Sequence, residues 1–151
     1  MHIITPDNSK DPPDNYLGFP ITTIPGYALA FYKAVTLSFG SSKIGDVIKS
    51  FKPDILHVTT PGTLLFRTAF AARKYKIPLV MSYHTHLVHY AHTYWPVPGS
   101  TWLAKSLIRA VHNLADLTLV TSPEMQSELI SIGVRRSAVW DKGVNTEVIN
   151  A

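Results

Sequence analysis

Three short apolar runs recur along this chain, and the stretches between them are long enough for at least one helix each. The runs cover residues 54–59 (DILHVT), 78–84 (PLVMSYH) and 117–121 (LTLVT). A strand buried on both faces reads as a continuous apolar run, and helix-length spacing is typical of parallel strands joined by crossover helices. The pattern therefore predicts an α/β fold with a doubly wound, Rossmann-like parallel sheet.

Weaker signals complete the predicted order of elements. Thr60 is predicted as the N-cap of a helix that has Pro61 in its first turn and runs to about residue 75. Ser122 is predicted to cap a helix that ends at Gly133. The remaining predicted elements are strands at 2–5, 21–24 and 138–140, a helix over 28–50 that breaks near 39–41, and a helix over 100–115.

The helix over 100–115 is predicted to be amphipathic. Its basic face carries Lys105, Arg109 and His112, which we expect to meet solvent or an anionic surface. The opposite, apolar face is predicted to be buried and consists of residues 103, 107, 111 and 114.

Composition narrows the classes of protein to which the chain can belong. With 151 residues, 46% hydrophobic and 16% charged, it predicts one globular domain or part of one. The absence of cysteine excludes disulfides and thiolate metal sites. No apolar run approaches the roughly 18 residues of a membrane span, and the N-terminal residues lack the pattern of a secretory leader.

Charge is distributed unevenly along the chain. Residues 55–115 contain no Asp or Glu, but they hold six Lys or Arg and six of the seven histidines. This bias favours a surface that faces phosphate, sulfonate or anionic lipid. The alternative is a core-rich segment with an ordinary solvated basic face.

Four histidines, His84, His86, His89 and His92, follow the second apolar run. Ligands of open parallel sheets bind at the carboxyl ends of the strands, so these side chains occupy a position expected for chemistry. A metal site is one alternative, but the HExxH spacing is absent and no carboxylate lies nearby in the sequence. Ordinary loop histidines are the other alternative, which we favour for His89 and His92.

Other kinds of site have little support. The chain has no GxSxG elbow, and Ser82 has no acid nearby to complete a triad with His84. The near absence of acids around the predicted site disfavours paired-carboxylate glycosidase chemistry. Basic and aromatic residues do not interleave as single-strand nucleic-acid binders require.

Four segments together resemble the N-terminal domain of retaining GT-B glycosyltransferases of family 4. They are KPDILHVTTPG, PLVMSYHTH, ADLTLVTSPEMQSEL and VWDKGVNTEVIN. Within that family the SYHTH block and the W-x-KGV segment are most similar to the sulfoquinovosyltransferases of plants and cyanobacteria. Asn145 stands where the family usually has an acid, which argues against a role through charge at that position.

The resemblance implies a particular domain organisation. Residues 1–142 would form the acceptor-side Rossmann-like domain without its first strand, and 143–151 would begin the interdomain hinge. The donor-binding C-terminal domain would be absent. No GxGxxG turn precedes the first predicted strand at 2–5, and the segment KGVNTEVINA after the last predicted strand stops abruptly, which fits this expectation. The chain alone would then be an inactive fragment.

The resemblance also implies site residues. His84 would be the catalytic-site histidine that contacts the donor sugar near C6, and His86 would assist at an anionic group there. A charge-assisted hydrogen bond from imidazole to a sulfonate would give the pair a physical purpose. The other residues implied to bind substrate are Thr60, Pro61, Gly62, Tyr83, Lys142 and Gly143.

The implied reaction is retaining transfer of sulfoquinovose from UDP-sulfoquinovose to diacylglycerol, without metal or other cofactor. The alternatives are mannosyl or glucosyl transfer to a lipid, or a truncated, non-catalytic lipid-binding module. We expect no nucleic-acid partner. The expected location is the periphery of a membrane, in plastids of a photosynthetic eukaryote or at the cytoplasmic membrane face of a bacterium. The residues expected to face the membrane are Arg67, Lys74, Trp102, Lys105 and Arg109.

Overall fold

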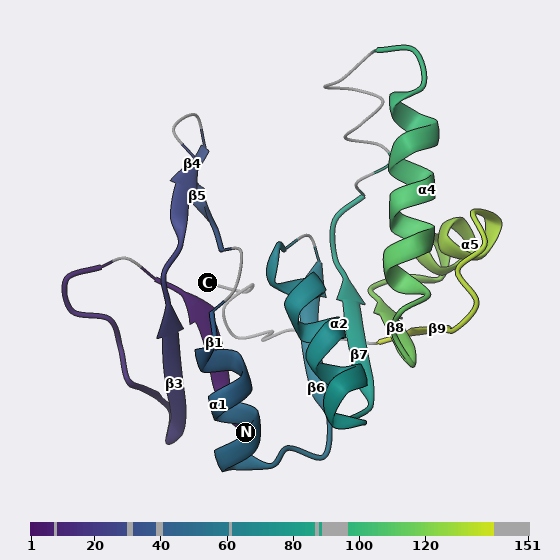
Figure 1. The fold of residues 1–151 in the computed structure, drawn as a ribbon. Coiled ribbons are helices and arrows are strands. Elements are labelled where there is room, and N and C mark those ends of the chain that lie inside the picture. Colours follow the sequence, from purple (N-terminus) through teal and green to yellow (C-terminus); the bar gives the residue numbers. More distant parts are fainter. Residues whose placement is uncertain are drawn as a thin grey trace, which may run out of the picture. The chain divides into compact units, whose positions relative to one another are not determined.

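A computed structural model describes residues 1–7, 9–29, 32–38, 41–60, 62–86, 88 and 97–140, with the backbone alone for 28–29 and 32–37. The chain divides into two compact units (Figure 1). The first unit comprises Met1–Val58 and Gly62–Leu79, and the second comprises Thr59–Pro61 and Val80–Ala151. Each unit is described by itself.

The first unit begins with a small sheet of strands β1 (Ile3–Pro6), β2 (Asn15–Tyr16) and β3 (Phe19–Ile24). β3 is central, parallel to β1 and antiparallel to β2. The turn between β2 and β3 places Leu17 and Gly18 at positive φ, as a tight hairpin requires. The strands predicted at 2–5 and 21–24 are thereby confirmed.

The helix predicted over 28–50 is wrong in its first part. The backbone forms an antiparallel pair, β4 (Tyr27–Leu29) and β5 (Tyr32–Leu37), and the helix of this stretch that the structure describes is α1 (Lys43–Phe51). Residues 27–37, YALAFYKAVTL, are rich in aromatic and β-branched residues. Such residues favour strands over helices, and counting apolar residues alone obscured that preference.

The core of the first unit joins α1 to α2 (Leu64–Tyr75) and to the small sheet. Ile44 and Ile48, one turn apart on α1, are buried together with Ile24 of β3 and Ala71 of α2. At its C-terminal end α1 closes with Lys52 in a left-handed conformation, whose N–H donates to the carbonyl of Ile48.

The start predicted for α2 is also wrong. Thr60 does not cap the helix, because it is the last residue of strand β6 (Leu56–Thr60), and the N-cap position is Thr63. The Thr63 hydroxyl accepts a hydrogen bond from the N–H of Ser38 at 3.0 Å and donates to the carbonyl of Ser38. Local N-cap preference did not distinguish two threonines three residues apart.

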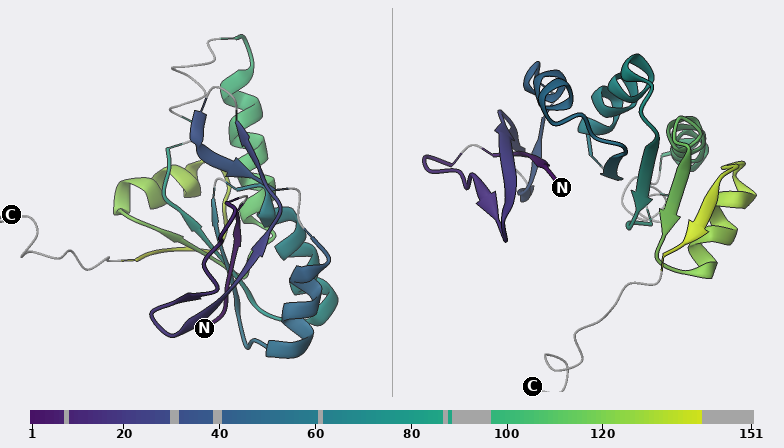
Figure 2. Two further views of the ribbon diagram at one scale, coloured as in Figure 1. Left: turned by 90° about the vertical axis from the view of Figure 1, so that its left-hand side faces the viewer. Right: turned by 90° about the horizontal axis from the view of Figure 1, so that it is seen from below.

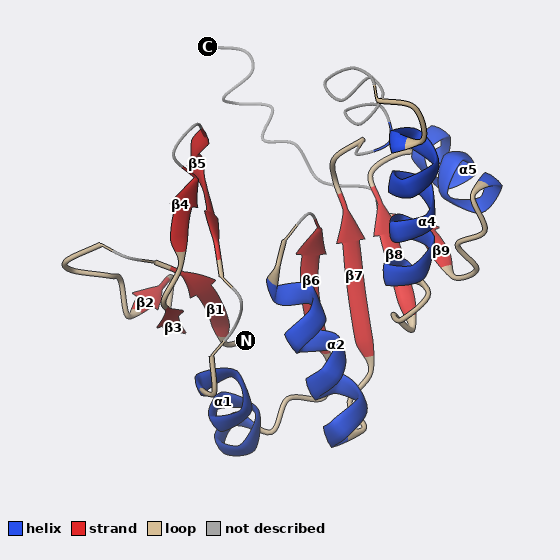
Figure 3. Ribbon diagram, turned by 45° about the horizontal axis from the view of Figure 1, so that its top comes forward, coloured by secondary structure: helices blue, strands red, loops and turns tan. Residues whose placement is uncertain are grey.

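The main sheet has the strand order β6-β7-β8-β9, with β7 at Leu79–Tyr83, β8 at Leu117–Val120 and β9 at Ser137–Val139. β8 runs parallel to both β7 and β9. Figure 3 shows these strands in red, and the parallel pairing puts the carboxyl ends of β7, β8 and β9 at one edge. The predicted α/β class with a parallel sheet is confirmed.

Among the described residues of the second unit, the helices α4 (Ser100–His112) and α5 (Pro123–Ser131) accompany β7, β8 and β9. α5 lies beside β8 and β9 (Figure 2). Its predicted cap is confirmed, since Ser122 Oγ accepts a hydrogen bond from the Met125 N–H at 3.2 Å. The core of this unit consists of Tyr83, Val88, Ile108, Val120, Met125, Leu129 and Val134.

The predicted faces of α4 are wrong in part, although Lys105 and Arg109 are exposed and Val111 is buried as expected. Leu103 and Leu107 are 62% and 55% exposed, whereas Ile108 and His112, which follow each other by one turn, are buried. His112 takes an inward position because buried hydroxyl groups satisfy its ring nitrogens. The sequence pattern assigned it outward on polarity alone.

Candidate functional site

The ends of two strands are joined by a buried hydrogen bond. Thr60, the last residue of β6, is 4% exposed, and its hydroxyl donates to the carbonyl of Ser82 on β7 at 2.9 Å. Ser82 and Tyr83 are fully buried, and the chain emerges at His84. Thr60 and Tyr83, predicted to bind substrate, are therefore interior residues that hold the strand ends.

His112 extends this hydrogen bond into a directed chain. Its Nδ1 lies 3.1 Å from Thr118 Oγ1, and its Nε2 lies 3.4 Å from Thr60 Oγ1. Because the Thr60 proton already goes to Ser82, the Thr60 oxygen must accept, so Nε2 carries the imidazole proton. Thr118 then donates to Nδ1.

Burial also sets the charge of His112. Desolvation lowers its pKa from 6.5 to about 4, so the ring is neutral at neutral pH. The Tyr83 ring meets it edge to face, with centroids 5.4 Å apart. His112 is therefore a structural group beneath the strand ends and does not belong to a basic surface.

His84 is the first residue after β7 and is only partly buried. Its ring lies 6.4 Å from the indole ring of Trp140, which follows β9. The parallel sheet brings these two strand ends to the same edge across 56 residues of sequence. Trp140 was not predicted as a site residue, although the W-x-KGV segment contains it.

His86 meets a carboxylate that the local sequence does not contain. Its Nδ1 lies 3.1 Å from Glu128 Oε2, and the two side chains are 48% and 27% exposed. Glu128 belongs to α5, 42 residues further along the chain. In this unit the helix that follows β8 lies next to the loop after β7. The order of parallel strands is therefore the feature that could have predicted the contact between His86 and Glu128.

Gly62 is the one remaining predicted substrate-binding residue that the structure describes. Gly62 precedes α2, where its carbonyl accepts a hydrogen bond from the Leu65 N–H at 3.3 Å. Within the described ranges, no three His, Asp or Glu side chains come together as metal ligands. The predicted residues that lie outside the described part of the chain are Pro61, Lys142, Gly143, His89 and His92.

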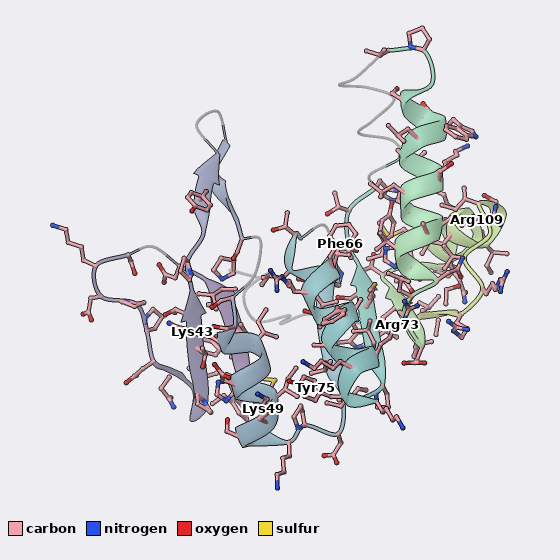
Figure 4. All side chains as sticks on the ribbon, in the orientation of Figure 1. Lys43, Lys49, Phe66, Arg73, Tyr75 and Arg109 are labelled. Atoms are coloured by element: carbon pink, nitrogen blue, oxygen red, sulfur yellow. The ribbon has the colours of Figure 1, made fainter. Side chains whose placement is uncertain are left out.

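Exposed apolar and basic side chains share the outer faces of α2 and, separately, of α4. On α2, Phe66 and Phe70 are 56% and 67% exposed, and Figure 4 shows Phe66 and Arg73 along the same helix. Arg67 and Lys74 are exposed on it too. No helix in the described residues has the length and apolarity needed to cross a membrane.

On α4 the exposed residues include Trp102, at 72%, with Leu103, Leu107, Lys105 and Arg109. The side chain of Arg109, labelled in Figure 4, packs closely against Gly133. A Cβ atom built on Gly133 would lie 3.2 Å from the Arg109 Nε. The Arg109 side chain thus covers the turn after α5.

Residues 1–148 match the family model of Glycosyltransferase Family 4. The chain is 36% identical over 145 residues to the sulfoquinovosyl transferase SQD2 of Arabidopsis thaliana, covering 91% of this chain and 28% of that protein. It is 28% identical over 135 residues to a GDP-mannose-dependent alpha-mannosyltransferase of Corynebacterium glutamicum, and the match covers 88% of this chain and 32% of that protein. A mannosyltransferase of the same description from Mycobacterium tuberculosis is 31% identical over 119 residues, and the match covers 78% of this chain and 31% of that protein. The chain thus spans about a third of the length of these relatives.

Proposed function

This chain belongs to Glycosyltransferase Family 4, and we propose that it forms the acceptor-side part of an enzyme that transfers a sugar from a nucleotide sugar to a lipid. The observation that carries this proposal is the 36% identity to a sulfoquinovosyl transferase across 91% of the chain. Residues 1–142 would supply the acceptor-side domain, and 143–151 would lead into the hinge. Because the chain spans about a third of the length of its relatives, we propose that the donor-binding part corresponds to the remainder of their length.

UDP-sulfoquinovose is the donor that we propose, with diacylglycerol as the acceptor. The name of the Arabidopsis relative supports this choice of donor. GDP-mannose is the second candidate, because two relatives at 28% and 31% identity bear the name of GDP-mannose-dependent mannosyltransferases.

His84 is the residue that we propose to contact the donor sugar. Its backbone is held by a fully buried neighbour, Tyr83, and its ring lies near that of Trp140. A partly exposed imidazole on a fixed strand end can donate a hydrogen bond with little loss of side-chain freedom. The buried chain through Thr60 and His112 supports that strand end from below.

The faces of α2 and α4 are proposed to contact an anionic membrane surface. Arg67 and Lys74 are exposed on α2, which also exposes Phe66 and Phe70. Separately, Lys105 and Arg109 are exposed on α4, which also exposes Trp102. Lysine and arginine attract anionic headgroups, and an exposed tryptophan is suited to the interface. Peripheral membrane attachment, in plastids or at the cytoplasmic face of a bacterial membrane, is the corresponding location.

Two segment replacements test the proposed donor and acceptor together. This chain replaces the matching segment in the Arabidopsis sulfoquinovosyl transferase and, separately, in the Corynebacterium mannosyltransferase. We expect sulfoquinovosyl transfer to diacylglycerol in the first chimera within about tenfold of the parent, and a loss of more than about a hundredfold in the second. The reverse result would assign the chain to a mannosyltransferase, and two inactive but folded chimeras would refute both assignments.

A further inference from the structure

The loop after β7 and the helix after β8 place a donor and an acceptor group side by side at the sheet edge. His86 Nδ1 lies 3.1 Å from Glu128 Oε2, within one compact unit. Both side chains retain access to solvent, with His86 48% exposed. A ligand can therefore reach the ring.

The hydrogen bond determines which nitrogen of His86 faces a ligand. An ionised carboxylate only accepts, so the contact with Glu128 requires a hydrogen on Nδ1. In the neutral ring Nε2 then has a lone pair and accepts. Among the described residues, the structure shows no other hydrogen bond to His86.

Glu128 also determines the charge of the pair. With a neutral ring the pair carries a net charge of −1, and with a protonated ring it carries none. In neither state is it a cation, so it offers no net attraction to a sulfonate or phosphate. It does offer an acceptor nitrogen and a carboxylate oxygen, and both groups accept hydrogen bonds from hydroxyl groups.

We propose that Glu128 is a positioning residue that orients His86, so that Nε2 accepts a hydrogen bond from a hydroxyl group of a substrate rather than meeting an anion. This replaces the sequence-based expectation that His86 assists at the sulfonate. It rests on the proposed function only for the source of the hydroxyl, which is either the sugar or the glycerol part of the acceptor.

Imidazole ¹⁵N spectra of the 151-residue chain test this proposal without any glycosyl transfer. The variants are Glu128→Gln, Glu128→Ala and the control Glu124→Gln, whose carboxylate on the same helix bonds instead to Ser122. At pH 8 we expect His86 to be protonated at Nδ1 in the wild type and in the control. Both substitutions of Glu128 should shift the ring toward the Nε2-protonated form.

Three probes added at constant ionic strength then distinguish the ligand classes. Methyl α-D-glucopyranoside represents the sugar, glycerol represents the acceptor, and sulfate represents an anion. We expect one of the two hydroxyl probes to move the Nε2 signal at pH 8, thereby identifying its source. Because the Glu128 carboxylate opposes an anion, sulfate should move the His86 signals of Glu128→Gln several-fold more than those of the wild type at the same pH.

Two results would overturn the proposal. One is an Nε2-protonated ring in the wild type, which would show that Glu128 does not set the tautomer. The other is a wild-type His86 that responds to sulfate as strongly as Glu128→Gln does, or to neither hydroxyl probe. Because these measurements do not depend on transfer activity, failure here leaves the outcome of the segment exchange separate.

Discussion

The Nε2 of His112 lies 3.4 Å from the hydroxyl oxygen of Thr60, linking the end of α4 to the end of β6 through the interior of the second unit. The same hydroxyl donates to the Ser82 carbonyl, two residues before His84. Buried hydrogen bonds between uncharged groups thus hold the strand end that carries His84.

The buried His112 makes the free energy of unfolding depend on pH in a defined direction. The pKa of His112 falls from 6.5 to about 4 on folding, so the unfolded state binds a proton more readily between these values. The contribution is fully present above pH 6.5 and is lost as the pH falls toward 4. Urea unfolding at pH 7, 5.5 and 4 should show that His112 lowers the free energy of unfolding by about 3 kcal/mol at most over this range.

His112→Gln provides the check on that assignment. Glutamine keeps a polar side chain but does not titrate, so the variant should be less stable at pH 7 and show a weaker dependence between pH 6.5 and 4. An unchanged dependence in the variant would assign the acid sensitivity to another group.

Thr60→Val should destabilise the chain by about 1–3 kcal/mol. The substitution keeps the shape but removes the hydroxyl, which leaves the Ser82 carbonyl and the His112 N–H without their partner in a buried place. The matched control is Thr68→Val, because the Thr68 hydroxyl donates to the Leu64 carbonyl of its own helix. Equal losses in both variants, measured by urea unfolding, would contradict a special role for Thr60.

Ser122→Ala should cost about 1 kcal/mol, because it removes the acceptor for the Met125 N–H at the start of α5. Ser127→Ala on the same helix is the control, since its hydroxyl donates to the Pro123 carbonyl inside the helix. The difference between their urea midpoints measures the cap. A loss for Ser127→Ala as large as for Ser122→Ala would argue against it.

His84→Ala should abolish most of the transfer activity of the sulfoquinovosyl chimera while leaving its folding unchanged. Activity that survives within about threefold would exclude the proposed sugar contact. His2→Ala serves as the control, because His2 bonds to Thr22 in the first unit. The measurement is kcat/KM for the nucleotide-sugar donor.

Replacing Lys105 and Arg109 with alanine should weaken binding to anionic vesicles by about 2 kcal/mol, or roughly thirtyfold, at low salt. The wild-type chain should lose affinity steeply as salt rises. Lys10→Ala with Lys52→Ala removes the same charge from exposed positions of the first unit. Equal effects of the two double variants in vesicle sedimentation would indicate only a dependence on net charge.

Much of the fold followed from the sequence alone. The runs at 54–59, 78–84 and 117–121 became β6, β7 and β8. Burial on both faces, which an unbroken apolar run predicts, holds for β7, whereas His57 and Thr59 of β6 are exposed. The cap at Ser122 was also readable, since its hydroxyl acts within three residues of sequence.

Tertiary structure decided the features that depend on distant partners. β4 and β5 took a segment predicted to be helical, because each strand supplies the other's backbone hydrogen bonds. His112 turned inward because Thr60 and Thr118, 52 and 6 residues away, satisfy its ring. Glu128 reached His86 only because parallel strands end at one edge, and no periodicity within either segment records that meeting.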